Sequence, residues 1–169
     1  MARSKHPQDK VEHYTIMTRA LMQTNAWRSL STTAQALYPW VRLEWKGPKA
    51  NNNGKISLSV RQAAERLGVS KDTAARAFQE LQAKGFLHVK ETASLGVHGH
   101  GRCFKFEITE ISLVPARDGR HLYKTWTKGN DYEVIKAVPA NPHGRRTKTL
   151  HKSSDSPIIE FKTLRAIPS

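Results

Sequence analysis

Apolar side chains recur at helical spacing along residues 59–85, which carry the sequence SVRQAAERLGVSKDTAARAFQELQAKG. Steps of three and four residues between apolar positions place them on one face of a helix. The stretch holds two such stripes on either side of the sequence GVS: Ala63, Ala64 and Leu67, then Ala74, Ala77, Phe78 and Leu81. The pattern predicts two amphipathic helices joined by a tight turn, the layout of a helix-turn-helix.

Polar residues and a glycine mark the ends of both predicted helices. Ser59 and Gln62 have the spacing of a capping box, in which each side chain bonds the backbone N–H of the other residue. Gly68 follows the first stripe, where a left-handed backbone ends a helix at little cost. Ser70 is placed to cap the second helix, and Asp72 adds negative charge near its N-terminal end. These signals predict a short, well-defined turn.

The second predicted helix has an outer face of mainly polar side chains. This face comprises Lys71, Asp72, Thr73, Ala75, Arg76 and Gln79. Lysine, threonine, arginine and glutamine are side chains that bond phosphates or base edges. The pattern alone fits a DNA reader and an ordinary helical hairpin with a solvated face equally well, so the flanking sequence decides between them.

A wing pattern follows the two helices. The run FLHVK starts a strand at Phe86 with Leu87 and Val89 on one face, and the glycine-rich loop ETASLGVHGHGR leads to CFKFEIT. In that last run Phe104, Phe106 and Ile108 alternate with Cys103, Lys105 and Glu107. With a short strand at Ile56 and Leu58, the pattern predicts an α+β, mainly α fold. It is a winged helix-turn-helix with a two- or three-stranded wing over residues 86–109 and basic terminal extensions.

The run GVSKDTAARAFQELQAKGFL resembles the reader segment of bacterial winged-helix regulators of the GntR type, and that of small winged-helix proteins carried by phages and plasmids. The resemblance covers the middle third to half of the chain. It implies that the helix beginning near Ser70 enters the major groove while the wing reaches an adjacent backbone or minor groove. GntR-type readers usually carry arginine directly after the apolar residue of this helix. That place is Ala75 here, with Arg76 next, so base contacts cannot be carried over.

The region before the reader predicts a basic arm and further helices. Residues 1–10 are polar and mostly basic, and residues 11–115 form the predicted DNA-binding domain. Candidates for burial in its first part are Tyr14, Ile16, Met17, Leu21, Trp27 and Leu30. A helix capped within residues 31–33 is expected to run to Trp45, covering one side with Ala34, Leu37 and Val41. Pro39 is expected to kink that helix or mark a restart.

Charge strengthens the nucleic-acid interpretation. The 169 residues carry 28 Lys and Arg against 14 Asp and Glu, a net charge of +14. Such a balance suits a polyanion, although it also serves solubility. With a helix-turn-helix present we expect double-stranded DNA as the partner. The predicted contacts are Ser70, Lys71, Asp72, Thr73, Arg76 and Gln79 in the second reader helix and His98, His100, Arg102 and Lys105 in the wing.

Other chemistries find little support in the sequence. Cys103 is the single cysteine, so no internal disulfide forms, and no apolar run has the length of a signal core or membrane span. We expect a cytoplasmic protein, nucleoid-associated when bound to DNA, with no membrane partner. His98-Gly99-His100 resembles the paired histidines of rolling-circle nucleases, but those flank a bulky residue on a strand. We therefore expect no catalytic residue, metal or cofactor.

Residues 116–169 form a basic C-terminal extension, expected to be partly disordered, with 11 basic and 5 acidic side chains. Leu122, Tyr123 and Trp126 are candidates to pack on the domain, and Tyr132, Val134, Ile135 and Val138 are candidates for another strand. Residues 158–167 are apolar enough to dock on a protein partner or on the domain itself. A DNA-clamping tail and a solvated tail both remain open.

The leading hypothesis is a sequence-selective DNA-binding protein, most simply a transcriptional regulator of a bacterium or mobile element. The alternatives are a replication initiator or accessory protein of a plasmid or phage, and a winged helix that docks on protein. A homodimer would suit a palindromic site, although no long heptad helix predicts one.

Overall fold

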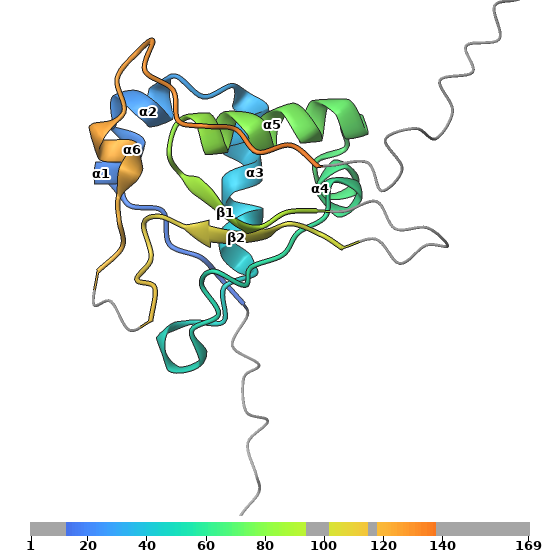
Figure 1. Cartoon of the computed structure of the whole chain (residues 1–169), viewed down its shortest axis with the longest axis horizontal. Coiled ribbons are helices and arrows are strands. Elements are labelled where there is room, and N and C mark those ends of the chain that lie inside the picture. Colours follow the sequence, from blue (N-terminus) through green and yellow to red (C-terminus); the bar gives the residue numbers. More distant parts are fainter. Residues whose placement is uncertain (1–12, 94–101, 115–117, 138–169) are drawn as a thin grey trace, which may run out of the picture.

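The computed structural model describes residues 13–93, 102–114 and 118–137 (Figure 1). Three helices precede the reader: α1 (Arg19–Met22), α2 (Asn25–Arg28) and α3 (Thr32–Leu43). A 3-10 turn (Pro48–Ala50) leads to α4 (Val60–Leu67) and α5 (Lys71–Ala83), followed by β1 (Leu87–Glu91), β2 (Lys105–Ile108) and α6 (Leu122–Thr125). This order confirms the predicted α+β, mainly α winged-helix fold.

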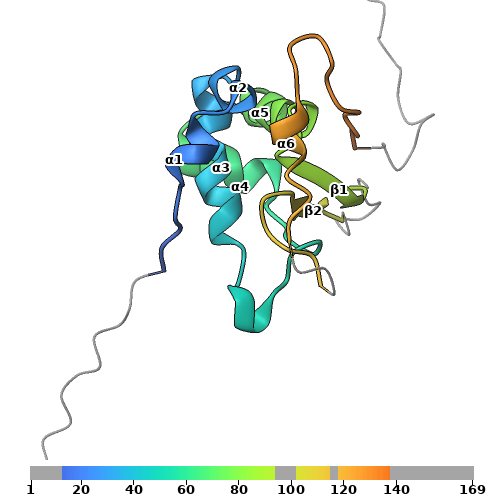
Figure 2. The ribbon, with the colours of Figure 1, turned by 90° about the vertical axis from the view of Figure 1, so that its left-hand side faces the viewer.

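The helix α3 crosses behind α5 and forms the back of the reader (Figures 1 and 2). Ser31 caps it by accepting the N–H of Ala34 at 3.3 Å, as the serine-threonine run predicts. Pro39 lies inside the helix, which continues to Leu43 without the restart that the sequence left open. Tyr38, one of the aromatic residues of this helix, is fully buried in the core.

The wing is a two-stranded antiparallel sheet. Leu87 pairs with Ile108 and Val89 with Phe106, and the register shifts between Val89 and Glu91. The predicted third strand is reduced to a single bridge, in which Ile56 donates its N–H to Phe106 and accepts in return. The buried sides of these strands therefore face α5.

The face of β2 that should point to solvent is covered. Glu107 alternates with apolar residues and was expected outside, but only 1% of it is exposed. Arg120 lies over that face and donates to both carboxylate oxygens of Glu107, at 2.7 and 2.8 Å. The expectation was wrong because the partner of this carboxylate comes from beyond the wing, where strand periodicity carries no information.

Aromatic rings from the N-terminal helices and from the segment after the wing meet at Phe86. This ring meets Trp27 and Tyr38 edge-on, with centroid separations of 5.8 and 5.3 Å, and stacks on Tyr123 at 5.0 Å. Burial of Tyr123 and Trp126 confirms the predicted packing of this part of the C-terminal region. Aromatic residues from α2, α3, the α5–β1 junction and α6 thus share one core.

Two other sequence expectations fail at the edges of the core. Tyr14 and Ile16 are 70% and 61% exposed, because they precede the first helix in an extended segment with no element above it. Residues 132–135 form no strand; instead they run along α5 as an extended segment. Val138 lies outside the described residues.

A buried ion pair ties α3 to the chain after β2. Arg42 pairs with Glu110, whose carboxylate also accepts the Tyr38 hydroxyl at 2.9 Å. Burial, followed by the charge of Glu110, raises the pKa of Tyr38 well above its usual value, so the phenol stays protonated and donates. Arg42 also donates to Thr15 at 3.1 Å, which fastens the segment before α1.

We expect Glu110→Ala to lower the free energy of unfolding by about 3 kcal/mol, because it leaves the Arg42 guanidinium buried without its counter-charge. The matched control is Glu65→Ala, which removes the exposed Arg61–Glu65 pair and should cost less than about 1 kcal/mol. Urea denaturation of both variants measures the difference. Equal losses would show that the Arg42–Glu110 pair behaves as a surface contact.

The α5–β1 junction depends on a left-handed glycine. Gly85 has φ of +77°, and the next residue, Phe86, donates its N–H back to Leu81 at 2.9 Å. A Cβ at Gly85 would lie 2.8 Å from Tyr132 Cε2 and 3.0 Å from the Leu122 backbone. This junction therefore requires glycine for its backbone and for the space beside it.

Gly85→Ala should destabilise the fold more than Gly129→Ala. Both glycines have positive φ, but a Cβ at Gly129 would have no neighbour within 4 Å. The control should lose about 1–2 kcal/mol from backbone strain alone, whereas Gly85→Ala adds a steric clash. Thermal and urea unfolding of the two variants test this; indistinguishable stabilities would contradict the close approach at Gly85.

Candidate nucleic-acid interface

The two helices α4 and α5 are held at a fixed corner by local hydrogen bonds. Ser59 accepts the N–H of Gln62 at 3.2 Å while the Gln62 side chain accepts that of Ser59 at 3.1 Å, which is the predicted capping box. Gly68 ends α4 with φ of +65°, and Val69 donates to Ala64 at 3.1 Å. Ser70 then caps α5 by accepting the N–H of Thr73 at 3.1 Å. The turn is as short as predicted.

The α5 helix buries one face and leaves another open. Ala74, Ala77, Phe78 and Leu81 are buried, as their spacing predicts, and Phe78 stacks on Phe106 of the wing at 5.3 Å. On the other face Ser70, Lys71, Asp72 and Arg76 are exposed, and Thr73 and Gln79 are partly exposed. All six predicted residues of this helix therefore lie on or beside its open side.

Hydroxyl groups link three of these side chains. The Ser70 and Thr73 hydroxyls lie 2.9 Å apart, and Arg76 donates from Nη2 to Thr73 Oγ1 at 3.5 Å. Ser70 thus serves the helix as its cap, and Thr73 holds the guanidinium along the helix surface. Most guanidinium donors of Arg76 remain available for an acceptor outside the protein.

Two of the four predicted wing contacts lie among the residues that the structure describes. Arg102 is exposed, and Lys105 is partly buried in β2, where it lies opposite Glu91 in the strand register. The predicted contacts His98 and His100 lie outside the described residues. Of the predicted wing contacts that the structure describes, Arg102 is therefore open to solvent and Lys105 is partly covered.

An apolar hollow separates α5 from the wing. It has a volume of about 320 Å³ and lies between Ala75 and Gln79 of α5 and Arg102 and Phe104 of the wing. Its remaining walls come from the start of α4, from Phe78 and Phe106, and from the segment of residues 131–137, which we call the strap. The open face of α5 and the wing thus border one concave surface.

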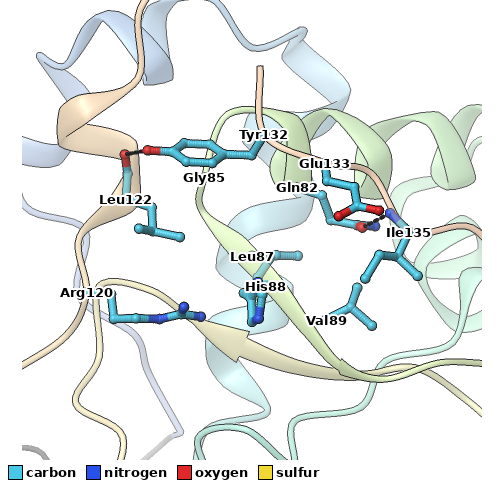
Figure 3. Close-up of a pocket in the computed structure, with 10 residues that line it drawn as sticks. All are labelled: Gln82, Gly85, Leu87, His88, Val89, Arg120, Leu122, Tyr132, Glu133 and Ile135. Carbon is cyan, nitrogen blue, oxygen red and sulfur yellow. Dashed lines mark hydrogen bonds between the residues drawn. The ribbon is translucent and has the colours of Figure 1, made fainter. Parts of the chain in front are cut away.

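A second, more polar hollow of about 260 Å³ lies between the strap and β1 (Figure 3). His88, Arg120 and Glu133 are among its lining residues. Partial burial and then the charge of Arg120 lower the pKa of His88, which favours its neutral form. Arg120 is already paired with Glu107. It is therefore not an unpaired cation that this hollow could offer to an anion.

Lys136 of the strap is a residue that sequence reasoning missed. It is exposed and lines the apolar hollow beside the open face of α5. The only signal was a lysine after the apolar residues Tyr132, Val134 and Ile135, which were assigned to a predicted strand. The position of Lys136 depends on how the strap folds back on α5.

Among residues 13–93, 102–114 and 118–137, no group of three or more histidine, cysteine, aspartate or glutamate side chains could hold a metal ion. Cys103 is an exposed free thiol. Among the helices of residues 13–137, none combines the length and apolar character needed to cross a membrane.

Residues 50–94 match the model of the MarR family. The match spans α4, α5 and β1, which is well under half of the chain, and similarity to GntR-type readers stays a prediction. No curated protein and no solved structure matches the chain. The observed fold and the family match together define a winged-helix DNA-binding protein of the transcription-regulator type.

Proposed function

We propose that this protein is a transcriptional regulator that binds double-stranded DNA sequence-selectively, with α5 in the major groove and the wing on the neighbouring backbone. The observation that carries the proposal is the open face of α5, where Lys71, Arg76 and Gln79 project from a helix capped at Ser70 and packed against α3 and the wing. The major groove of B-DNA admits one α-helix and presents a distinct hydrogen-bond pattern for each base pair.

Each side chain on this face has a role suited to its chemistry. Arg76 can bond guanine through two donors, and Gln79 can bond adenine in the same bidentate manner. Lys71, at the first turn of α5, and Arg102, on the wing, suit phosphates on either side of the helix. Asp72 lies in the first turn of α5, where its negative charge stabilises the helix by interacting with the positive N-terminal end.

The proposed function extends to the source of the protein and to its oligomeric state. The resemblance of residues 68–87 to bacterial and mobile-element readers supports a regulator from a bacterium, phage or plasmid. A homodimer would place two copies of α5 about one helical turn of DNA apart and would recognise a palindrome. Selection of bound duplexes from random sequence reports the recognised motif and its symmetry together.

Arg76→Ala and Gln79→Ala should each weaken binding to the selected site by about 1–3 kcal/mol, while binding to unrelated duplexes changes less. Fluorescence anisotropy with both duplexes measures the two affinities. Arg28→Ala, an exposed arginine on α2, is the matched control and should leave both unchanged. Equal losses on all sequences would assign Arg76 and Gln79 to phosphate contacts only.

Lys71→Gln, Arg102→Gln and Lys105→Gln should each reduce the salt dependence of binding. A cation placed on a phosphate releases condensed counterion, so each lost contact lowers the slope of log affinity against log salt by about 0.9. Titrations between low and moderate salt give the slope for each variant. A slope equal to that of the unaltered protein would remove that residue from the interface.

A further inference from the structure

The strap is fastened to the C-terminal end of α5 by two hydrogen bonds from its backbone N–H groups. Tyr132 donates its N–H to the carbonyl of Ala83 at 2.8 Å. Ile135 donates its N–H to the side-chain oxygen of Gln82 at 3.0 Å (Figure 3). The Tyr132 hydroxyl in turn donates to the carbonyl of Leu122 at 3.0 Å. Gln82 is only 3% exposed, so the acceptor for the Ile135 N–H is a buried side chain.

From this anchor the strap runs along α5 toward its N-terminal half. Tyr132 lies at the end of the helix, whereas Lys136 and Ala137 line the same hollow as Ala75 and Gln79. Figure 1 shows this course, with the orange strap passing along α5 toward α4. The strap thus delivers the side chain of Lys136 to the flank of the open face of α5.

Charges along the strap are unevenly placed. Asp131, near its start, lies 3.6 Å from Lys84 and accepts the Trp126 indole N–H, and Glu133 borders the polar hollow on the β1 side. Lys136 is exposed and makes no ion pair with any residue that the structure describes. The acidic part of the strap therefore lies away from the predicted DNA-contacting residues, and its cation lies beside them.

The helix α5 places no cation on the side that faces the hollow. Its residues that line the hollow are Ala75, Phe78, Gln79 and Gln82, and Arg102 lines the hollow from the wing side. A helix seated in the major groove has a phosphate backbone along each flank. Cations on that flank would then come from the strap and the wing rather than from α5.

We propose that Lys136 contacts the DNA backbone, and that the strap forms a third part of the DNA interface beside α5 and the wing. This inference rests on the proposed function. It gives the strap, a part of the C-terminal region, the role of placing Lys136 on a phosphate. A phosphate contact adds affinity on every sequence and selects none.

The test compares Lys136→Gln with Lys128→Gln in the full chain. Lys128 is also an exposed lysine of the C-terminal region, but it sits in the turn between Thr127 and Asn130, away from the hollow. Lys136→Gln should lower the salt slope by about 0.9 and weaken specific and non-specific duplexes by the same factor. Lys128→Gln should bind as the unaltered protein does.

A second variant tests whether the hydrogen bond from Ile135 to Gln82 is needed to position Lys136. Gln82→Met removes the acceptor for the Ile135 N–H at similar side-chain volume. If the strap positions Lys136, adding Lys136→Gln to Gln82→Met should change the salt slope less than Lys136→Gln does alone. An equal change in both backgrounds would overturn the role of the anchor.

Failure of DNA binding as such and failure of the Lys136 contact give different results. If the unaltered protein ignores duplex DNA at low ionic strength, the proposed function is wrong and this inference falls with it. If the unaltered protein binds duplex DNA but Lys136→Gln keeps its slope and affinity, only the strap contact is overturned. Circular dichroism of each variant confirms that the fold is retained in these comparisons.

Discussion

The packing of Phe86 among rings from both halves of the chain is the interaction on which the rest of the structure depends. This residue follows directly after the left-handed Gly85, so the end of α5 and the start of the wing are set by one turn. Trp27 and Tyr38 meet the ring from the N-terminal helices, and Tyr123 stacks on it from beyond the wing. The direction of α5 is therefore fixed at its C-terminal end by a shared core rather than by its own sequence alone.

That core decides which surface remains for a partner. Phe78 stacks on Phe106, which holds the wing against one side of α5, and α3 covers another. The side left open bears the lysine, arginine and glutamine that suit DNA, while the flank toward the wing is hollowed and edged by Arg102 and Lys136. A rigid helix with one open face is what recognition in the major groove requires.

Two carboxylates of the described residues are committed to internal ion pairs. Glu110 is paired with Arg42, and Glu107 with Arg120, and both carboxylates hold segments that are distant in sequence. Removing these charged groups from water costs free energy, but each pair specifies which distant segments lie together. Their further consequence is that these negative charges lie away from the open face of α5, where they would repel phosphate.

What the sequence determined by itself was local. Helical periodicity, the Ser59–Gln62 capping box, Gly68 and the Ser70 cap predicted α4, the turn and α5 nearly residue by residue, because each signal acts within four residues. Tertiary structure alone decided that Glu107 is buried under Arg120, that Tyr14 is left in solvent, and that the strap lies on α5 instead of forming a strand. These outcomes depend on partners far away along the chain, and periodicity reports only the face a residue occupies, never what covers that face.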